Sequence, residues 1–343
     1  MLGGIQCGRA VAAIMVAVFH ANSFFLPDKL YGGRDAGAGW SMGYAGVEFF
    51  FVLSGFIMLY VHARDFGVPA RAQRFMRKRI VRIYPFYWCV MALLLLSYAA
   101  LPGTGPEAAR DPLTVLGSLL LWPGTVPQVM NVAWTLQHEM LFYLVFVTMI
   151  LSARAGVALF GGWMLACLVA VPFGIEALPL AFLLSPYNLL FLFGMVAAHA
   201  TGRLSVPVAW ALFAAGAVLF FGVGLIEQWT ELAWHRGART LLYGIGAALM
   251  VAGLASGRPP VPRWLSFLGD ASYAIYLVHV PVMSAATLVV AKLGLQEGVP
   301  PALMLALLVA TGVTAGAVAH VLVERPLLRA FAGRPPPATQ PSA

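Results

Sequence analysis

Ten long apolar runs constrain the fold of this 343-residue chain more than any other feature of its sequence. Each run is about 20 residues long, the length that an α-helix needs to cross a hydrocarbon core about 30 Å thick. Strands of a membrane barrel would be shorter and would alternate apolar with polar residues. The runs therefore predict an all-α, polytopic transmembrane helical bundle with about ten spans, at residues 7–26, 43–62, 82–101, 133–152, 156–174, 179–199, 206–225, 238–255, 266–291 and 301–322.

The composition agrees with a chain that is largely buried in lipid. Hydrophobic residues make up 61% of the sequence and charged residues only 10%, whereas soluble domains carry about 25% charged residues. A net charge of +8 would suggest nucleic acid as the partner of a soluble chain. Here the positive-inside bias of membrane proteins explains the charge better. The sequence therefore predicts an integral membrane protein with the lipid bilayer, and no nucleic acid, as a partner.

The distribution of lysine and arginine predicts the orientation of the bundle. If the N-terminus lies in the cytosol, 15 of the 21 basic residues fall on the cytosolic side. This excess favours ten spans with both the N- and the C-terminus in the cytosol. The six basic residues on the outer side are then Lys29, Arg34, Arg110, Arg236, Arg239 and Lys292.

Few segments lie outside the ten runs. Residues 1–330 are predicted to form one transmembrane domain, followed by a disordered, Pro-rich cytosolic tail at 331–343. The apolar run 113–122 is too short to cross and is expected to be interfacial or re-entrant. The first run has too thin a charged leader for a secretory signal and is expected to be retained. The three cysteines show no metal or disulfide spacing, so buried free thiols are predicted at Cys7, Cys89 and Cys167.

Arg9 and His20 bracket the first apolar run and lie eleven residues apart. At about 100° per residue this separation is within about 20° of three full turns, so both side chains share a helix face, about 16 Å apart along the axis. His20 is then expected near the bilayer middle, where an ionisable group is costly and usually faces a cavity or a partner. A polar helix contact, or a histidine bonded to a nearby carbonyl, is the structural alternative.

Residues 46–56 (GVEFFFVLSGF) open the second span and contain an acid, a hydroxyl and two glycines. Gly46 and Gly55 would let a neighbouring helix or a ligand approach the backbone closely. Glu48 is expected near the outer end of the span, either as a functional carboxylate or as an interfacial acid. Ser54 is expected to bond to its own helix or to line a cavity.

Seven basic residues lie between Arg64 and Arg82. Topology and anionic headgroups account for such a cluster without any further function. The alternative is recognition of a cytosolic polyanion, for which the arginine fork suits phosphate groups. Arg79 and Arg82 are three residues apart and share a helix face. Because the chain has no Walker loop and no GxGxxG motif, an ordinary nucleotide-binding fold is not expected to receive that polyanion.

Residues 134–143 (WTLQHEMLFY) begin the fourth span at its outer end. Trp134 and His138 precede a carboxylate, Glu139, which is expected either to orient a histidine or to hold a sugar hydroxyl. Glu139 and Tyr143 are four residues apart and are expected to bond on one helix face, which is also the structural interpretation.

Residues 269–279 (GDASYAIYLVH) begin the ninth span. Asp270 fits a helix N-cap, and Tyr276 lies one turn before His279. At the end of the tenth span, His320 and Glu324 have i,i+4 spacing, and Glu324 with Arg325 is interpreted as an interfacial charge pair.

With these motifs in order, the chain resembles the acyltransferase-3 family of bacterial membrane acyltransferases over residues 4–330. The matching residues are Arg9 and His20 with ten residues between them, the segment 46–56, Arg79 with Arg82, the segment 134–139 and the segment 272–279. Within the family, the chain looks most like the branch that acetylates exopolysaccharide subunits. Glu48 stands where many relatives have aspartate, which keeps the carboxylate. The esterase-like C-terminal domain of some members has no counterpart here.

The resemblance implies transfer of an acyl group, commonly acetyl from the donor substrate acetyl-CoA, to a hydroxyl of a glycan or lipid-linked oligosaccharide at the bacterial inner membrane. It implies no permanently bound cofactor and no metal. Arg9, Arg79 and Arg82 would bind acyl-CoA. His20 would deprotonate the acceptor hydroxyl or carry the acyl group itself, since a histidine pKa of about 6.5 suits a base at neutral pH. Glu48 and Glu139 would orient the acceptor or the imidazole.

Five further residues of the matching motifs are expected to bind substrate or to be structural: Ser54, Trp134, His138, Tyr276 and His279. Two other classes of function remain open. A secondary transporter would also need intramembrane His, Arg and Glu, but it would move substrate without consuming acyl-CoA. A structural subunit of a polysaccharide export complex would tolerate the loss of Arg9 and His20.

The orientation can be tested by cysteine labelling in a variant without the three native cysteines. Because of the basic asymmetry, a cysteine at Arg71 should react with an impermeant maleimide only from the cytosolic side, and one at Arg110 only from the outer side. Labelling of both positions from the same side would contradict the ten-span topology.

Overall fold

The computed structural model describes residues 2–101, 105–123, 128–229 and 236–331, and its regular secondary structure there is all helical. Ten helical stretches in these ranges are long and apolar enough to cross a membrane, which confirms the predicted fold class. They are Gly3–Leu30, Ala38–Asp65, Pro69–Ala100, Asn131–Leu151, Ala153–Phe173, Leu180–Ala200, Val206–Glu227, Arg236–Gly257, Ser272–Lys292 and Pro301–Phe331. The predicted tail from residue 332 onward lies outside the described residues.

Fourteen α-helices make up most of the described chain. Their bounds are α1 Gly3–His20, α2 Gly46–His62, α3 Ala72–Ala100, α4 Pro112–Leu120, α5 Trp134–Leu151, α6 Ala153–Ala170, α7 Leu180–Leu183, α8 Tyr187–Ala200, α9 Val206–Trp229, α10 Arg236–Gly257, α11 Arg263–Asp270, α12 Ser272–Lys292, α13 Pro301–Ala319 and α14 Arg325–Phe331. Two π-helical segments and one 3₁₀-helix extend them: π-helical η1 (Ala21–Leu30) follows α1, the 3₁₀-helix η2 (Ala38–Ala45) precedes α2, and π-helical η9 (His320–Glu324) joins α13 to α14.

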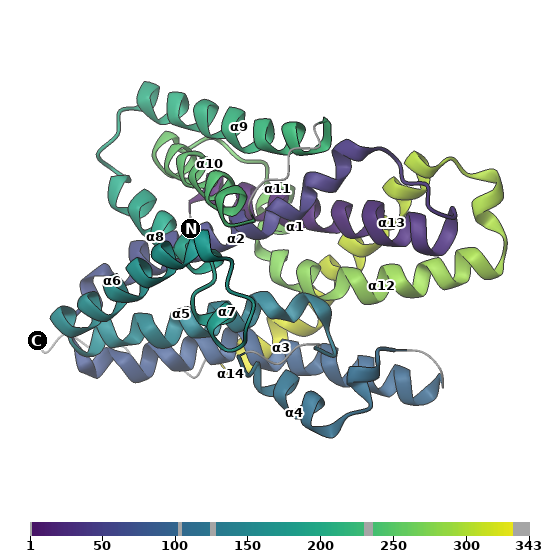
Figure 1. Ribbon diagram of the computed structural model, residues 1–343, viewed down its shortest axis with the longest axis horizontal. Coiled ribbons are helices and arrows are strands. Elements are labelled where there is room, and N and C mark those ends of the chain that lie inside the picture. The colour runs from purple at the N-terminus through teal and green to yellow at the C-terminus, as the bar shows by residue number, and fades with distance from the viewer. Residues whose placement is uncertain (1, 102–104, 124–127, 230–235, 332–343) are drawn as a thin grey trace, which may run out of the picture.

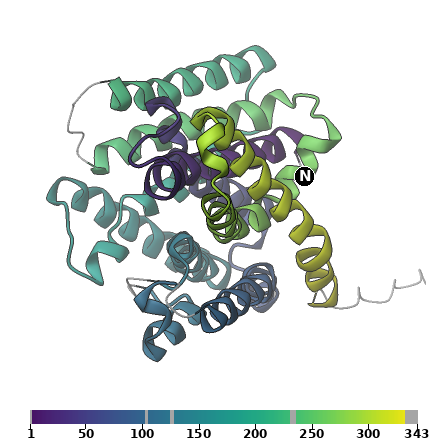
Figure 2. The same ribbon diagram turned by 90° about the vertical axis from the view of Figure 1, so that its right-hand side faces the viewer.

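The helices pack mainly as pairs: α2 with α8, α9 with α10, α12 with α13, and α5 with α6 (Figure 1). The first helix contacts α2, α10, α11, α12 and α13 and therefore runs through the centre of the bundle. Figure 2 shows the same centre from one end, with the other helices around α1. This position brings the face that carries Arg9 and His20 against the start of α12.

Close helix contacts explain two glycines on the α2–α8 interface. A Cβ atom at Gly55 would overlap the backbone of Phe191, and one at Gly194 would overlap the backbone carbonyl of Val52. Small residues at such positions let transmembrane helices approach closely, so that packing, rather than water, drives their association. Of the two alternatives expected for Gly55, the structure shows the approach of a helix.

Four sequence predictions need correction. The ninth run is broken, because α11 ends at Asp270 and α12 begins at Ser272. Asp270 is therefore not a helix N-cap; its carboxylate accepts a hydrogen bond from Gln6 Nε2 at 2.5 Å instead. The third helix starts ten residues before the predicted 82, so its basic segment is helical. Of the three predicted buried thiols only Cys167 is buried, while Cys7 is half-buried and Cys89 is exposed.

The short helix α4, predicted to be interfacial or re-entrant, ends against α3. Its last residues accept hydrogen bonds from Tyr84, Tyr87 and Trp88, which lie close to the middle of the 29-residue helix α3. The last carbonyls of a helix have no partner within the helix, and these three side chains satisfy the carbonyls of Leu120, Ser118 and Leu119.

The glycine packing can be tested by adding a single methyl group. Gly194→Ala should destabilise the bundle by about 1 to 3 kcal/mol because the new Cβ overpacks the interface. The matched control is Gly162→Ala on the exposed face of α6, where nothing lies within 4 Å of the new atom. Thermal unfolding in detergent measures both. A Gly194→Ala protein that melts no lower than the control would contradict the interface.

Candidate active site

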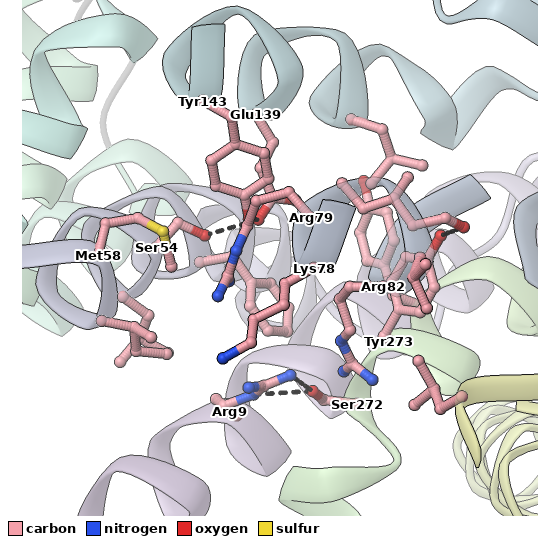
Figure 3. A pocket seen from close by; sticks show the side chains of 18 of the residues that line it. Arg9, Ser54, Met58, Lys78, Arg79, Arg82, Glu139, Tyr143, Ser272 and Tyr273 are labelled. Carbon is pink, nitrogen blue, oxygen red and sulfur yellow. Dashed lines mark hydrogen bonds between the residues drawn. The ribbon is translucent and has the colours of Figure 1, made fainter. Parts of the chain in front are cut away.

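A cavity of about 810 Å³ opens between α1, α2, α3, α5, the start of α12 and the η9–α14 segment (Figure 3). Its walls come from segments far apart in the sequence, which meet here because α1 runs through the centre of the bundle. The volume falls within the range typical of small-molecule sites, about 300 to 1,000 Å³.

One end of the cavity is strongly basic. Its basic lining residues are Arg74, Arg77, Lys78, Arg79, Arg82 and Arg325. Five of these come from the first three turns of α3, and the sixth comes from α14. Because all six lie at the start of the third span or at the end of the tenth, they share one side of the bundle, the side predicted to be cytosolic.

Arg79 and Arg82 are held by neighbouring groups and point into the cavity, with Lys78 beside them (Figure 3). The Arg79 guanidinium lies 5.6 Å from the ring centres of both Phe75 and Tyr143. Its Nε atom is buried without a hydrogen-bond partner among the described residues. Arg82 lies 5.3 Å over the ring of Tyr273. Arginine stacked on aromatic rings in this way is pre-organised for an anion and leaves hydrogen-bond donors to offer it.

A buried carboxylate orients Arg82. Glu324 is 0% exposed and accepts hydrogen bonds from Arg82 Nη1 at 2.5 Å and from the predicted partner His320 at 2.6 Å. The other ring nitrogen of His320 lies 3.0 Å from Arg325 Nε. The expected pairing of Glu324 with Arg325 is therefore wrong, because the π-helical turn η9 directs the carboxylate inward to α3 and Arg325 to the histidine.

Two polar contacts lie next to these basic residues in the same cavity. Arg9 donates from Nε and Nη2 to the Ser272 hydroxyl, at 3.1 and 3.0 Å. On the facing wall, the Glu139 carboxylate accepts from Ser54 Oγ at 3.2 Å and from the Tyr143 hydroxyl. The expected bond between Glu139 and Tyr143 is therefore present. Both contacts surround the same internal space (Figure 3).

Tyr276 forms the inner wall of the cavity. Its hydroxyl bonds to Thr135 Oγ1 at 2.9 Å and to the Val132 carbonyl at 3.0 Å, so the ring is fixed between α12 and the start of α5. The ring of His279 lies behind it, with ring centres 6.0 Å apart.

His20 meets His279 on the far side of this wall. The two ring centres are 5.0 Å apart, and His20 Nδ1 lies 3.3 Å from His279 Nε2. His20 is half-buried, whereas His279 is 0% exposed. Among the described residues, the lining of the cavity includes Arg9 but neither histidine.

Three further expected site residues, besides His20 and His279, lie away from the cavity. Glu48 is 0% exposed, and neither carboxylate oxygen has a hydrogen-bond partner among the described residues. His138 is buried between Trp134 and Phe182 and bonds to Asn188 Oδ1 at 2.8 Å. Trp134 packs on Phe51. The surroundings of His138 and Trp134 are those of packed, satisfied side chains.

Sequence reasoning missed several residues that complete the site, chiefly Lys78, Ser272 and Tyr273. Ser272 and Tyr273 lie inside a motif that was recognised, but only their contacts with Arg9 and Arg82 reveal a role. No group of three or more His, Cys, Asp or Glu side chains suited to hold a metal ion occurs within the described ranges.

Comparison with known proteins places the chain in a family. The profile described as "Acyltransferase domain" matches residues 2–321, and the chain belongs to this acyltransferase-3 family of membrane enzymes, as its motifs predicted. It is 34% identical to the exopolysaccharide production protein ExoZ of Rhizobium meliloti, over 87% of this chain and 94% of the relative. It is 30% identical to the acyltransferase MdmB of Streptomyces mycarofaciens, over 88% of this chain and 85% of the relative. No solved structure matches.

Proposed function

We propose that this protein transfers an acetyl group from cytosolic acetyl-CoA to a hydroxyl of an exopolysaccharide, or of its lipid-linked oligosaccharide precursor, at the bacterial inner membrane. The observation that carries this proposal is that one cavity combines a cluster of basic residues with the Arg9–Ser272 and Ser54–Glu139–Tyr143 groups. Such a cavity suits a donor with an anionic head and a neutral reactive arm.

The basic end suits the phosphates of acyl-CoA. Arginine forks match phosphate oxygens, and charge-assisted hydrogen bonds are about twice as strong as neutral ones. Arg79 has an unused, buried Nε, and Arg82 is fixed by Glu324 and Tyr273. The arginine pair is thereby organised before the donor arrives, so less conformational entropy is lost on binding.

The polar groups beside the arginines suit the thioester. The thioester of the donor would lie between Arg9 and the Ser54–Glu139–Tyr143 group, which line the same partly enclosed cavity. Electrostatic interactions are stronger in such a site than in water. Arg9 would stabilise negative charge that develops on the carbonyl oxygen, and Glu139 would hold a hydroxyl of Ser54, of Tyr143 or of the acceptor.

His20 is the proposed base. In direct transfer, His20 takes the proton of the acceptor hydroxyl, the new C–O bond forms, the C–S bond breaks, and the proton passes to the departing thiolate. In the two-step route, the acyl group first bonds to a ring nitrogen of His20 and then moves to the acceptor. Either route needs the wall formed by Tyr276 to move, because it separates the cavity from His20.

The similarity to ExoZ favours an exopolysaccharide acceptor, since that relative is named as an exopolysaccharide production protein. The similarity to MdmB, an acyltransferase by name, favours acyl transfer as the reaction. Glu48 has no part in this mechanism, because its carboxyl is closed off from the cavity and from solvent.

Removing the arginine pair tests the donor site. Arg79→Ala with Arg82→Ala should raise the KM for acetyl-CoA, because each lost charged hydrogen bond costs about 1.5 to 3 kcal/mol. Steady-state kinetics with varied acetyl-CoA measures this effect. The matched control is Arg110→Ala, which removes an exposed arginine predicted on the other side of the membrane. An unchanged KM in the double variant would leave the cluster with a role in topology only.

Removing the imidazole tests the base. His20→Ala should lower kcat by about 10²- to 10⁴-fold as the loss of a general base, and by more if the residue carries the acyl group. The fold should persist, because the change removes a costly polar group from the bundle. His199→Ala, which truncates an exposed histidine on α8, is the control. Near-normal acetylation by a monodisperse His20→Ala protein would exclude His20 as the base.

A further inference from the structure

We infer that His279 is a positioning residue that fixes the tautomer of His20, so that His20 Nε2 carries the free lone pair used in acyl transfer. The inference rests on the proposed function for the role of His20. The arrangement of the two rings and of two backbone carbonyls stands independently of that role.

Two carbonyl groups define where the protons lie. His279 Nδ1 lies 3.1 Å from the carbonyl oxygen of Ile275, and His20 Nδ1 lies 2.9 Å from that of Val16. A carbonyl oxygen only accepts hydrogen bonds, so each Nδ1 must carry a proton to satisfy its contact. In a neutral imidazole the other nitrogen, Nε2, is then an unprotonated acceptor in both residues.

The contact between the rings agrees with this assignment. His279 Nε2 lies 3.3 Å from His20 Nδ1. With His279 Nε2 unprotonated, the proton of this contact belongs to His20 and is shared between His279 and the Val16 carbonyl, a three-centre arrangement common in helices. The opposite assignment would place a proton on His279 Nε2. In that case the unprotonated Nδ1 of His279 would face the Ile275 carbonyl oxygen, and the unprotonated Nδ1 of His20 would face the Val16 carbonyl oxygen. Both contacts would be repulsive.

Burial separates the roles of the two histidines. His279 is 0% exposed, and a Cβ atom on Gly312 of α13 would lie 3.2 Å from its own Cβ, so α13 packs directly on its helix. An acceptor hydroxyl therefore cannot reach His279. His20 is half-buried and borders Phe24, whose side chain is 45% exposed. His20 is thus the ring that an acceptor can approach, and His279 acts through it.

The pair accounts for the proton throughout the reaction. The hydroxyl proton of the acceptor moves to His20 Nε2 as the oxygen attacks the thioester carbonyl. The resulting imidazolium keeps its Nδ1 proton and donates a hydrogen bond from it to His279 Nε2 and to the Val16 carbonyl oxygen. When the C–S bond breaks, the Nε2 proton passes to the thiolate, which restores neutral His20 and releases the thiol of CoA. A neutral imidazole suits this supporting position inside a membrane better than a carboxylate, whose buried charge would be costly.

Two variants separate positioning from packing. His279→Leu removes the acceptor and should lower kcat about 10- to 100-fold, as for other residues that orient a functional imidazole, with little change in the KM for acetyl-CoA. His279→Gln keeps an acceptor oxygen and should recover most of that loss. His199→Leu on the exposed surface serves as the control. A His279→Leu protein with the wild-type kcat, or a His279→Gln protein no better than the Leu variant, would overturn the inference.

The tautomer can also be measured directly, without a rate measurement. In wild-type protein labelled with ¹⁵N-histidine, the ring-nitrogen shifts should show the proton on Nδ1 in both residues, assigned by comparison with His20→Asn and His279→Gln. A proton on Nε2 of His279 would overturn the inference. If His20→Ala keeps full activity, the proposed base falls while the tautomer result stands. If the His279 variants keep the wild-type kcat while His20→Ala loses activity, the positioning role of His279 is refuted and His20 remains the proposed base.

Discussion

The structure depends on the cost of holding charge inside a bundle that spans a bilayer. An ionised side chain there must find a partner or face a cavity, and Arg9, Arg82 and Glu139 do both. Arg82 is paired with Glu324, whose side chain is 0% exposed, Arg9 bonds to Ser272, and Glu139 accepts from Ser54 and Tyr143. These contacts join α1 to α12, α3 to η9, and α2 to α5. The same groups that the proposed chemistry needs therefore also join the segments that surround the cavity.

The cavity and the histidine pair divide the protein into two functional regions. The proposed donor region lies on the side predicted to be cytosolic, and its basic residues come mainly from one continuous helix, α3. The second region lies beyond Tyr276, where half-buried His20 meets fully buried His279. Because Tyr276 is bonded to Thr135 and Val132, a shift of α12 relative to α5 would open a path between the regions, and gating of this kind is common in enzymes that must exclude water.

The sequence predicted the fold well, since long apolar runs leave a membrane protein few alternatives to helices. It also brought Arg9, Ser54, Arg79, Arg82, Glu139 and Tyr276 to attention, and all of these line the cavity. It did not predict the partners. Nothing in the local pattern of residues 320–325 shows that a π-helical turn directs Glu324 to Arg82 rather than to its neighbour Arg325. Glu48 and His138 share motifs with the cavity residues but lie on other faces of their helices, because a motif fixes sequence spacing and not the direction of each side chain.

The central claim is that one membrane-embedded cavity takes acyl-CoA from the cytosolic side and delivers its acyl group to a glycan. The most direct test supplies radiolabelled acetyl-CoA to everted inner-membrane vesicles and to right-side-out vesicles that contain the protein and its acceptor. The account predicts labelled glycan and an equal amount of free CoA thiol only in everted vesicles, and neither product with the His20→Ala protein. Labelling that requires donor on the outer side, or movement of glycan across the membrane without release of CoA, would contradict it.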